Sequence, residues 1–236
     1  KKEGANSYSI RVNVEEAGNL LYAASRVLNK MPKAYKGYVI AEIPFSQFIK
    51  GDFDYTYNWN IDQSNSLVFH VGAGVAYPYG NVKVLPFEKR YFSGGPNSVR
   101  GWSVRSLGPG SYRGADGRMN YINHTGDIKL DLNIEYRTHL FWMLNGAFFV
   151  DAGNIWTLKD DNTEDGRLAM FRWDTFAESI AANWGVGLRL NFGFLLLRLD
   201  AGMKVHDPAR EVKWVNPGQW LDTENYALHF GVGYPF

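Results

Sequence analysis

Apolar and polar residues alternate with a period of two along most of this chain. The alternation is most regular at residues 128–137, where Ile128, Leu130 and Leu132 are separated by charged and amide side chains. A period of two predicts a β-strand with one apolar and one polar face. We therefore predict eight strands, with cores near residues 8–15, 53–62, 67–77, 128–137, 148–151, 184–192, 195–206 and 226–236.

The segments between these strands alternate between long and short. Long ones lie near residues 17–38, 78–125, 157–182 and 207–223, and short turns lie near 63, 140 and 193. We expect a short helix at 20–28 in the first long segment, and one extended segment from Val39 to Asp62. Long loops at one end and short turns at the other are typical of outer-membrane barrels.

Aromatic residues gather where the predicted strands end, as bilayer interfaces favour. Examples are Tyr57, Trp59, Tyr77, Tyr79, Phe141, Trp142, Trp156, Trp184, Tyr234 and Phe236. A soluble sandwich of two sheets would also alternate, but would join its apolar faces in a dry core. The loop pattern and the aromatic ends favour an all-β, antiparallel transmembrane β-barrel. Its charged side chains would face the lumen, among them Asp131, Glu135, Arg189, Arg198 and Asp200.

Composition narrows the classes of function. The chain has 236 residues, a net charge of +1 and no cysteine. A near-neutral chain lacks the basic face that nucleic acids require, and the absence of cysteine excludes disulfides and thiolate metal sites. No apolar run is long enough for a membrane-spanning helix. The start at Lys1, without Met or a leader, indicates a mature protein or an excised piece.

Catalytic and metal-binding patterns are missing. The five histidines, at 70, 124, 139, 206 and 229, lack metal-ligand spacing, and we interpret them as lumen or loop side chains. Asp160, Asp161, Glu164 and Asp165 form an acidic stretch without the glycine and ligand spacing of a calcium loop. We therefore expect no enzyme, no cofactor and no metal site.

A glycine-rich stretch in the long loop at residues 80–125, called the Arg100 loop below, stands out from the strands. Gly94, Gly95, Pro96 and Gly101 force tight turns around Arg100. Arginine carries five donors in a rigid fork that fits carboxylates. The local sequence alone allows either a solvated arginine or one that binds acidic partners.

Four segments resemble the BamA/TamA superfamily of outer-membrane assembly proteins, also called the bacterial surface antigen family. Residues 91–102 read Tyr-Phe-Ser-Gly-Gly-Pro-Asn-Ser-Val-Arg-Gly-Trp, with Ser-Leu-Gly-Pro at 106–109, and resemble the family's signature loop. The family usually has Phe or Tyr where this chain has Trp102. Further matches are residues 133–137, residues 148–156 with the Phe-x-Asp-x-Gly pattern, and the aromatic-ended terminus 230–236.

The resemblance implies a sixteen-stranded barrel preceded by periplasmic repeat domains. Three strands precede the loop here and five follow it, so we expect one domain at 1–236: the C-terminal half of such a barrel, or a small eight-stranded barrel. The first barrel half and the periplasmic domains would be missing from this chain. Long loops, including the inserted loop at 80–125 with its Val-Arg-Gly-Trp motif, would be extracellular.

The resemblance also implies site residues. In the loop these are Gly94, Gly95, Val99, Arg100, Gly101 and Trp102. The loop would fold into the lumen, where Arg100 would contact Asp151 and Glu135; strand parity independently places both carboxylates on the polar face. The terminal strand, with Phe230, Gly233, Tyr234 and Phe236, would carry the insertion signal and form one side of a seam that opens. Gly231, Gly233 and Pro235 would weaken pairing there.

The function implied is assembly, insertion or translocation of proteins at a Gram-negative outer membrane, without chemical catalysis. Its partners would be membrane lipid and unfolded outer-membrane or secreted proteins. Three alternatives stay open: a passive channel or structural barrel, a two-partner secretion pore with the same loop, and a soluble eight-stranded fold.

Overall fold

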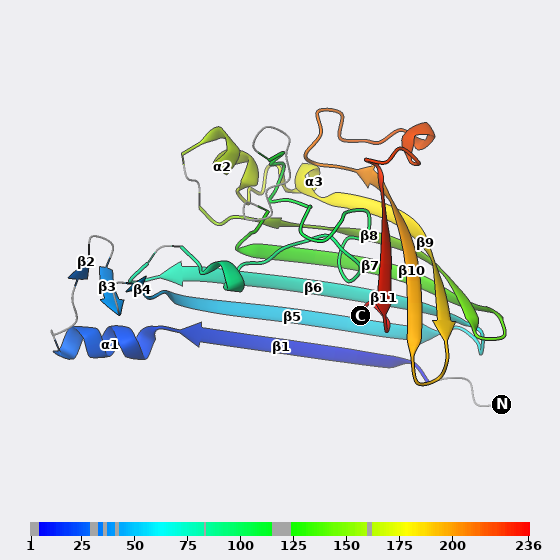
Figure 1. Ribbon diagram of the computed structural model, residues 1–236, viewed down its shortest axis with the longest axis horizontal. Helices are drawn as coiled ribbons and strands as arrows, with labels where there is room; N and C mark the ends of the chain where they lie inside the picture. Colours follow the sequence, from blue (N-terminus) through cyan, green and yellow to red (C-terminus); the bar gives the residue numbers. More distant parts are fainter. Residues whose placement is uncertain are drawn as a thin grey trace.

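The computed structural model describes residues 5–28, 33–34, 37–40, 43–82, 84–114, 124–159 and 162–236. Its main element is an eight-stranded sheet in which every neighbouring pair is antiparallel (Figure 1). The strand order is β1 (Ser7–Ala17), β5 (Gln47–Asn60), β6 (Asn65–Tyr79), β7 (Ile128–Phe141), β8 (Leu144–Trp156), β9 (Ala181–Asn191), β10 (Leu196–His206) and β11 (Tyr226–Val232). The predicted antiparallel architecture, with three strands before the Arg100 loop and five after it, is confirmed.

The remaining elements lie in the long connections. They are α1 (Asn19–Leu28), β2 (Lys33–Ala34), β3 (Gly37–Ile40), β4 (Ile43–Pro44), η1 (Phe87–Lys89), α2 (Glu164–Ala169), α3 (Phe176–Ser179) and η3 (Pro217–Gln219). The expected helix at 20–28 is present as α1. Among the described residues, no helix combines the length and apolar character needed to cross a membrane.

The sheet exposes its apolar side chains and buries its charged ones, the reverse of a soluble protein. Its apolar rows are exposed, as at Leu228, Phe230 and Val232 on β11, which are 63–68% exposed. Its ions and amides are buried on the other face, where Asp131, Glu135 and Asp151 are at most 2% exposed. Soluble proteins almost never bury charges while exposing whole apolar rows. The arrangement fits a sheet with hydrocarbon outside and a polar interior, and it excludes the soluble sandwich.

The sheet curls around the Arg100 loop. Figure 1 shows β10 and β11 crossing over the central strands of the sheet. Arg100 of the loop lies between the two parts, because it contacts Glu135 on β7 and His229 on β11. Two small apolar clusters pack the loop against the strands. One contains Phe48, Ala76, Leu85, Tyr91 and Ile155, and the other contains Val99, Trp102, Leu107 and Ala181.

The ends of the sheet differ as predicted. The long connections lie at one end in Figure 1, and the short turns 61–64, 142–143 and 192–195 lie at the other. The turn at 61–64 is polar: Asp62 accepts hydrogen bonds from the Asn65 amide and from the backbone N–H groups of Ser64 and Asn65. These bonds, that of the Asn65 side chain above all, lower the pKa of Asp62, so this tip stays charged at neutral pH.

The last strand is shorter than predicted. The pattern predicts a strand to Phe236, but β11 ends at Val232 because Gly233 adopts a φ of +81° and Pro235 has no N–H for the ladder. The chain then turns inward. The Arg137 guanidinium lies 4.2 Å from the centre of the Tyr234 ring, and the Phe236 ring stacks on His70 with 4.7 Å between centres. Tyr234 and Phe236 are therefore not an outward extension of the apolar row.

Two other expectations were wrong in detail. The expected extended segment at 39–62 is divided between the end of β3, β4 and β5, with β5 beginning at Gln47. Trp156 was expected in an interfacial girdle, but it is 1% exposed. Its ring packs against Phe171 and Phe176 of the following long loop, and its indole N–H donates to Ser179 Oγ at 2.9 Å. Trp156 thus anchors a loop to the sheet.

The residues of the short turns predict that some of these turns contact lipid and others do not. The turns after β7 and β9 carry Trp142 (76% exposed) and Phe194 (91% exposed), unlike the charged turn at Asp62. Because aromatic rings partition to bilayer interfaces, we expect Phe194 to lie in the headgroup region and Gln63 in water. The chain has no cysteine, so Phe194→Cys and Gln63→Cys can each carry one environment-sensitive fluorophore in this chain.

In vesicles containing the full-length protein, the label at 194 should emit at shorter wavelength and be quenched by brominated lipid, whereas the label at 63 should not. Equal emission and equal quenching at the two sites would contradict the placement of Phe194 in the headgroup region and of Gln63 in water.

Candidate functional site

The Arg100 loop turns back on itself on the concave face of the sheet. Gly94 and Gly95 have φ angles of +90° and +102°, a region that residues with a Cβ rarely adopt. The Gly95 N–H donates to the Trp102 carbonyl at 2.8 Å, which closes the base of the tip. Within this tip Ser98 N–H donates to Gly95 O and Trp102 N–H to Val99 O, both at 3.3 Å. The turns present Arg100 to the strands behind it.

The residues beside Arg100 fix the depth of the tip. Val99 and Trp102 are buried against Leu107 and Ala181, so they hold the loop to the start of β9. Gly101 lies against Asn183 of β9, and a Cβ at this position would be 2.7 Å from that of Asn183. A side chain at 101 would therefore push the tip away from the sheet.

Arg100 is fully buried and binds two carboxylates. Its Nε and Nη2 donate to the two oxygens of Asp151 at 2.9 and 2.8 Å, and its backbone N–H donates to Asp151 at 3.0 Å. Its Nη1 donates to Glu135 Oε2 at 2.5 Å. The guanidinium also lies 3.5 Å from the centre of the Phe149 ring. The structure thus brings together the three residues that the sequence singled out, from the loop, β8 and β7.

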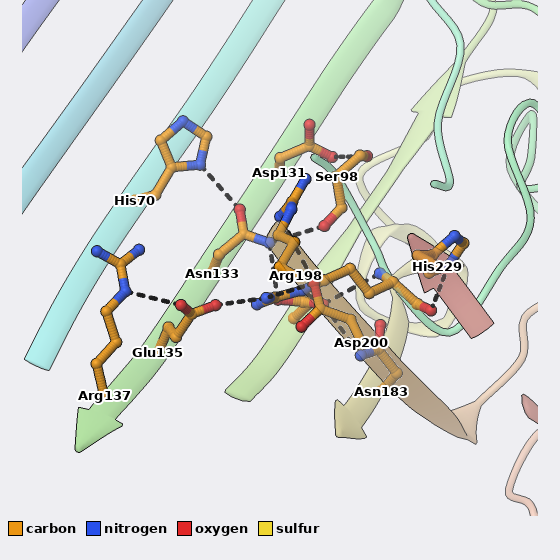
Figure 2. A network of polar contacts seen from close by, with 12 residues as sticks. His70, Ser98, Asp131, Asn133, Glu135, Arg137, Asn183, Arg198, Asp200 and His229 are labelled. Atoms are coloured by element: carbon orange, nitrogen blue, oxygen red, sulfur yellow. Dashed lines mark hydrogen bonds and ion pairs between the residues drawn. The ribbon is translucent and has the colours of Figure 1, made fainter. Parts of the chain in front are cut away.

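The network extends further than sequence reasoning proposed (Figure 2). Glu135 also accepts from Arg137 at 2.7 Å, as Figure 2 shows, and from Arg189 at 3.2 Å. Asp200 on β10 pairs with Arg189 at 2.6 Å, and lies 3.5 Å from Arg198 and 4.0 Å from Arg100. The network therefore connects β7, β8, β9 and β10 with the loop, through arginines and carboxylates that alternate along it.

Amides complete the shell around Asp151. Asn133 Nδ2 donates to Asp151 at 2.9 Å and to the Ser98 carbonyl at 2.9 Å, and Asn183 Nδ2 donates to Asp151 at 3.1 Å. Asn133 and Asn183 are the direct register partners of Asp151 on β7 and β9. Ser98 Oγ donates to Asp131 at 2.7 Å. The strand register could have identified both asparagines, but the sequence alone does not give that register.

The other predicted residues lie elsewhere. Phe230 points outward from β11, whereas Gly233, Tyr234 and Phe236 lie beyond the strand, and the last two turn inward. All five histidines have local partners, Asn133 for His70, Gly108 for His124, Asn145 for His139, Ile180 for His206 and Arg100 for His229.

The described part of the acidic stretch, Glu164 and Asp165, lies in a helix. Within the described part of the chain, no group of three or more His, Asp and Glu side chains could hold a metal ion. Glu164 and Asp165 occupy the first turn of α2, after Thr163, which caps it by accepting from Gly166 N–H at 2.9 Å. Asp160 and Asp161 lie outside the described residues.

Comparisons with known proteins found a family model and several similar proteins. Residues 42–236 match the family model described as the Omp85 superfamily domain. The chain is 29% identical over 128 residues to the outer membrane protein assembly factor BamA of Neisseria meningitidis serogroup B, a match covering 50% of this chain and 15% of that protein. It is 27% identical over 194 residues to the sorting and assembly machinery component 50 homolog A of Xenopus laevis, covering 80% of this chain and 38% of that protein.

The fold is also found in a solved structure. The crystal structure of BamA from Haemophilus ducreyi lacking POTRA domains 1-3 matches with a TM-score of 0.56 at 14% identity, over 97% of this chain and 51% of that one. At this identity the likeness concerns the fold. The chain spans about half or less of the length of these relatives.

The buried ion network predicts a strong and specific effect of replacing Arg100. Arg100→Ala leaves Glu135 and Asp151 short of a buried counter-charge, and breaking such a pair costs about 3–5 kcal/mol. Arg100→Lys keeps the charge but loses the two-pronged contact, so we expect a smaller loss. Arg113→Ala, which removes a half-exposed loop arginine 3.3 Å from Glu211, is the matched control and should change little.

The measurement is the temperature at which the folded band of the full-length protein disappears in semi-native electrophoresis. The expected order of loss is Arg100→Ala, then Arg100→Lys, then Arg113→Ala. Equal melting of the Arg100→Ala and Arg113→Ala proteins would contradict the importance of the network.

Proposed function

Because the chain belongs to the Omp85 superfamily, we propose that it is the C-terminal part of a barrel that inserts or translocates proteins at an outer membrane without chemical catalysis. The observation that carries this proposal is the Val-Arg-Gly-Trp tip, folded into the polar side of the sheet and held by Arg100 on Asp151 and Glu135. The names of the two relatives, an assembly factor and a component of a sorting and assembly machinery, support the same role.

The proposed working part is the end of the sheet at β11. This strand has seven residues and pairs with β10 over seven positions, whereas β10 pairs with β9 over ten. A short terminal strand leaves main-chain groups that an incoming strand can use. In hydrocarbon an unpaired edge costs several kcal/mol per group, so the edge needs a partner at every stage. The missing barrel strands or a folding substrate would provide it.

Catalysis is not part of the proposal. In the described interior, the carboxylates closest to Arg100 pair with arginines and amides, and none of them faces a nucleophile arranged for activation.

The proposed location is the outer membrane of a Gram-negative bacterium. The two relatives come from a bacterium and a vertebrate, so the bacterial source of this chain is part of the proposal too. The proposed partners are membrane lipid, unfolded barrel or secreted proteins, the missing barrel half and periplasmic domains.

A passive channel is the second candidate. The sheet pattern would serve it equally well, but the interior favours the first proposal. The loop tip and its ion network occupy the concave face, beside cavities of about 270 and 400 Å³. The loop tip and its network thus take up space that a channel would need for water and ions. A secretion pore of the two-partner type would share the loop and differ in its periplasmic domains.

The proposed function predicts that substrate contacts β11 and not the middle of the sheet. A photo-reactive amino acid replaces Leu228 on β11 or Leu188 on β9; both side chains point outward and are 63% and 48% exposed. In vesicles containing the full-length protein and an unfolded barrel substrate, we expect crosslinks from 228 that disappear as the substrate becomes folded. Position 188 is the matched control.

Steady ion conductance without substrate insertion would contradict this function and support the channel. Equal crosslinking from 228 and 188 would contradict the proposed site of entry.

A further inference from the structure

The inner face of β11 carries a single polar side chain. Strand parity directs Ala227, His229 and Gly231 inward and Leu228, Phe230 and Val232 outward, and the exposures agree: Ala227 and His229 are 8% exposed. Alanine and glycine cannot form side-chain hydrogen bonds. His229 is therefore the one residue of β11 whose side chain can hold this strand to a polar group inside the sheet.

His229 contacts the backbone of Arg100. Its Nε2 lies 3.0 Å from the Arg100 carbonyl oxygen, and Figure 2 shows the His229 ring beside β11, on the side of the polar network. A carbonyl only accepts, so Nε2 must carry the proton and donate. The ring is buried and 129 residues from its acceptor along the chain. An unpaired carbonyl at this depth would be costly, which gives the contact a physical reason.

The neighbouring strand is shaped to admit this carbonyl. Gly202 on β10 faces the Arg100 carbonyl so closely that a Cβ there would overlap the oxygen. Gly202 is the register partner of Ala227, two positions before His229 on β11. Beside it, Arg198 of β10 passes over Gly231 and donates to Asn97 of the loop. The loop tip is thus seated against both β10 and β11.

Arg100 consequently links two parts of the sheet. Its side chain is bound to β7 and β8, and its carbonyl is bound to β11. The side-chain contacts are charge-assisted and fully buried, whereas the contact with β11 is one hydrogen bond involving a neutral acceptor. When β11 is displaced, we expect the hydrogen bond between His229 and the Arg100 carbonyl to break first. The loop then stays in place on β7 and β8.

We propose that His229 is a positioning residue that fastens the terminal strand to the Arg100 loop, so that β11 moves away from the interior only when this hydrogen bond opens. The inference deepens the proposed function, because displacement of β11 matters there as entry of a substrate strand. The hydrogen bond would set how often that edge is free.

The test is a distance measurement in the full-length protein in vesicles. Spin labels are placed at Ser103→Cys, an exposed loop position, and at Val232→Cys, which points outward from β11; the chain offers no native cysteine. The reference pair joins Ser103→Cys to Leu188→Cys on β9. Three versions are compared: His229, His229→Gln and His229→Leu. Gln places an amide donor at a reach similar to Nε2, and Leu fills the space without a donor.

We expect the 103–232 distance to have one narrow population with His229 and with His229→Gln. His229→Leu should raise the displaced population roughly three- to tenfold, the weight of one neutral hydrogen bond. The 103–188 distance should stay unchanged in all three. A 103–232 distribution in His229→Leu as narrow as in the wild type would overturn the proposal.

Two further outcomes keep the test decisive. If His229→Leu folds poorly, His229→Ala replaces it as the variant without a donor, and amide hydrogen exchange of β11 and β9 is compared between His229→Ala and His229→Gln. We expect faster exchange in Ala than in Gln for β11 alone; equal β11 exchange in the two variants would overturn the proposal. If the 103–232 distance responds as expected while substrate insertion is unchanged by His229→Leu, the fastening stands and the proposed use of the β11 edge fails.

Discussion

The structure depends on one buried interaction, the Arg100 guanidinium between Asp151 and Glu135. Taking such ions out of water costs several kcal/mol each, and their attraction repays it only when hydrogen bonds satisfy the remaining lone pairs. Asn133, Asn183, Arg137 and Arg189 provide those bonds. The network therefore fixes a position more than it adds stability: the loop can settle at one depth and in one register, where its arginine meets both carboxylates.

The inverted sheet makes such a network possible. Hydrocarbon outside needs only apolar side chains, so the strands can place every ion and amide on the concave face. A loop entering that face meets donors and acceptors on each strand, from Asp131 on β7 to His229 on β11. The first and last strands of the sheet are β1 and β11. β1 has 11 residues, whereas β11 has only 7. A buried ion network beside a short edge strand suits the opening at β11 that we propose.

Much of the fold and part of the Arg100 site could be predicted from the sequence alone. A period of two is directly legible, so eight strands, their faces and the long and short connections followed from the sequence. Asp151 and Glu135 were identifiable because parity puts them inside and a family resemblance points to them. The contributions of Asn183, Arg189 and Asp200 needed the register between strands, which one chain of letters does not contain. The inward turn after Val232 was missed because Tyr234 and Phe236 continue the apolar alternation, while Gly233 and Pro235 end the ladder.

Arg100, Asp151 and Glu135 act as one energetic unit. A double-mutant cycle measures this most directly, with Arg100→Ala, Asp151→Ala and the combined variant compared by urea unfolding of the full-length protein in detergent. We expect a coupling of about 2–3 kcal/mol, as for residues in one buried network, and a coupling near zero for Arg113 and Glu211. Additive losses for Arg100 and Asp151, within about 0.5 kcal/mol, would contradict it.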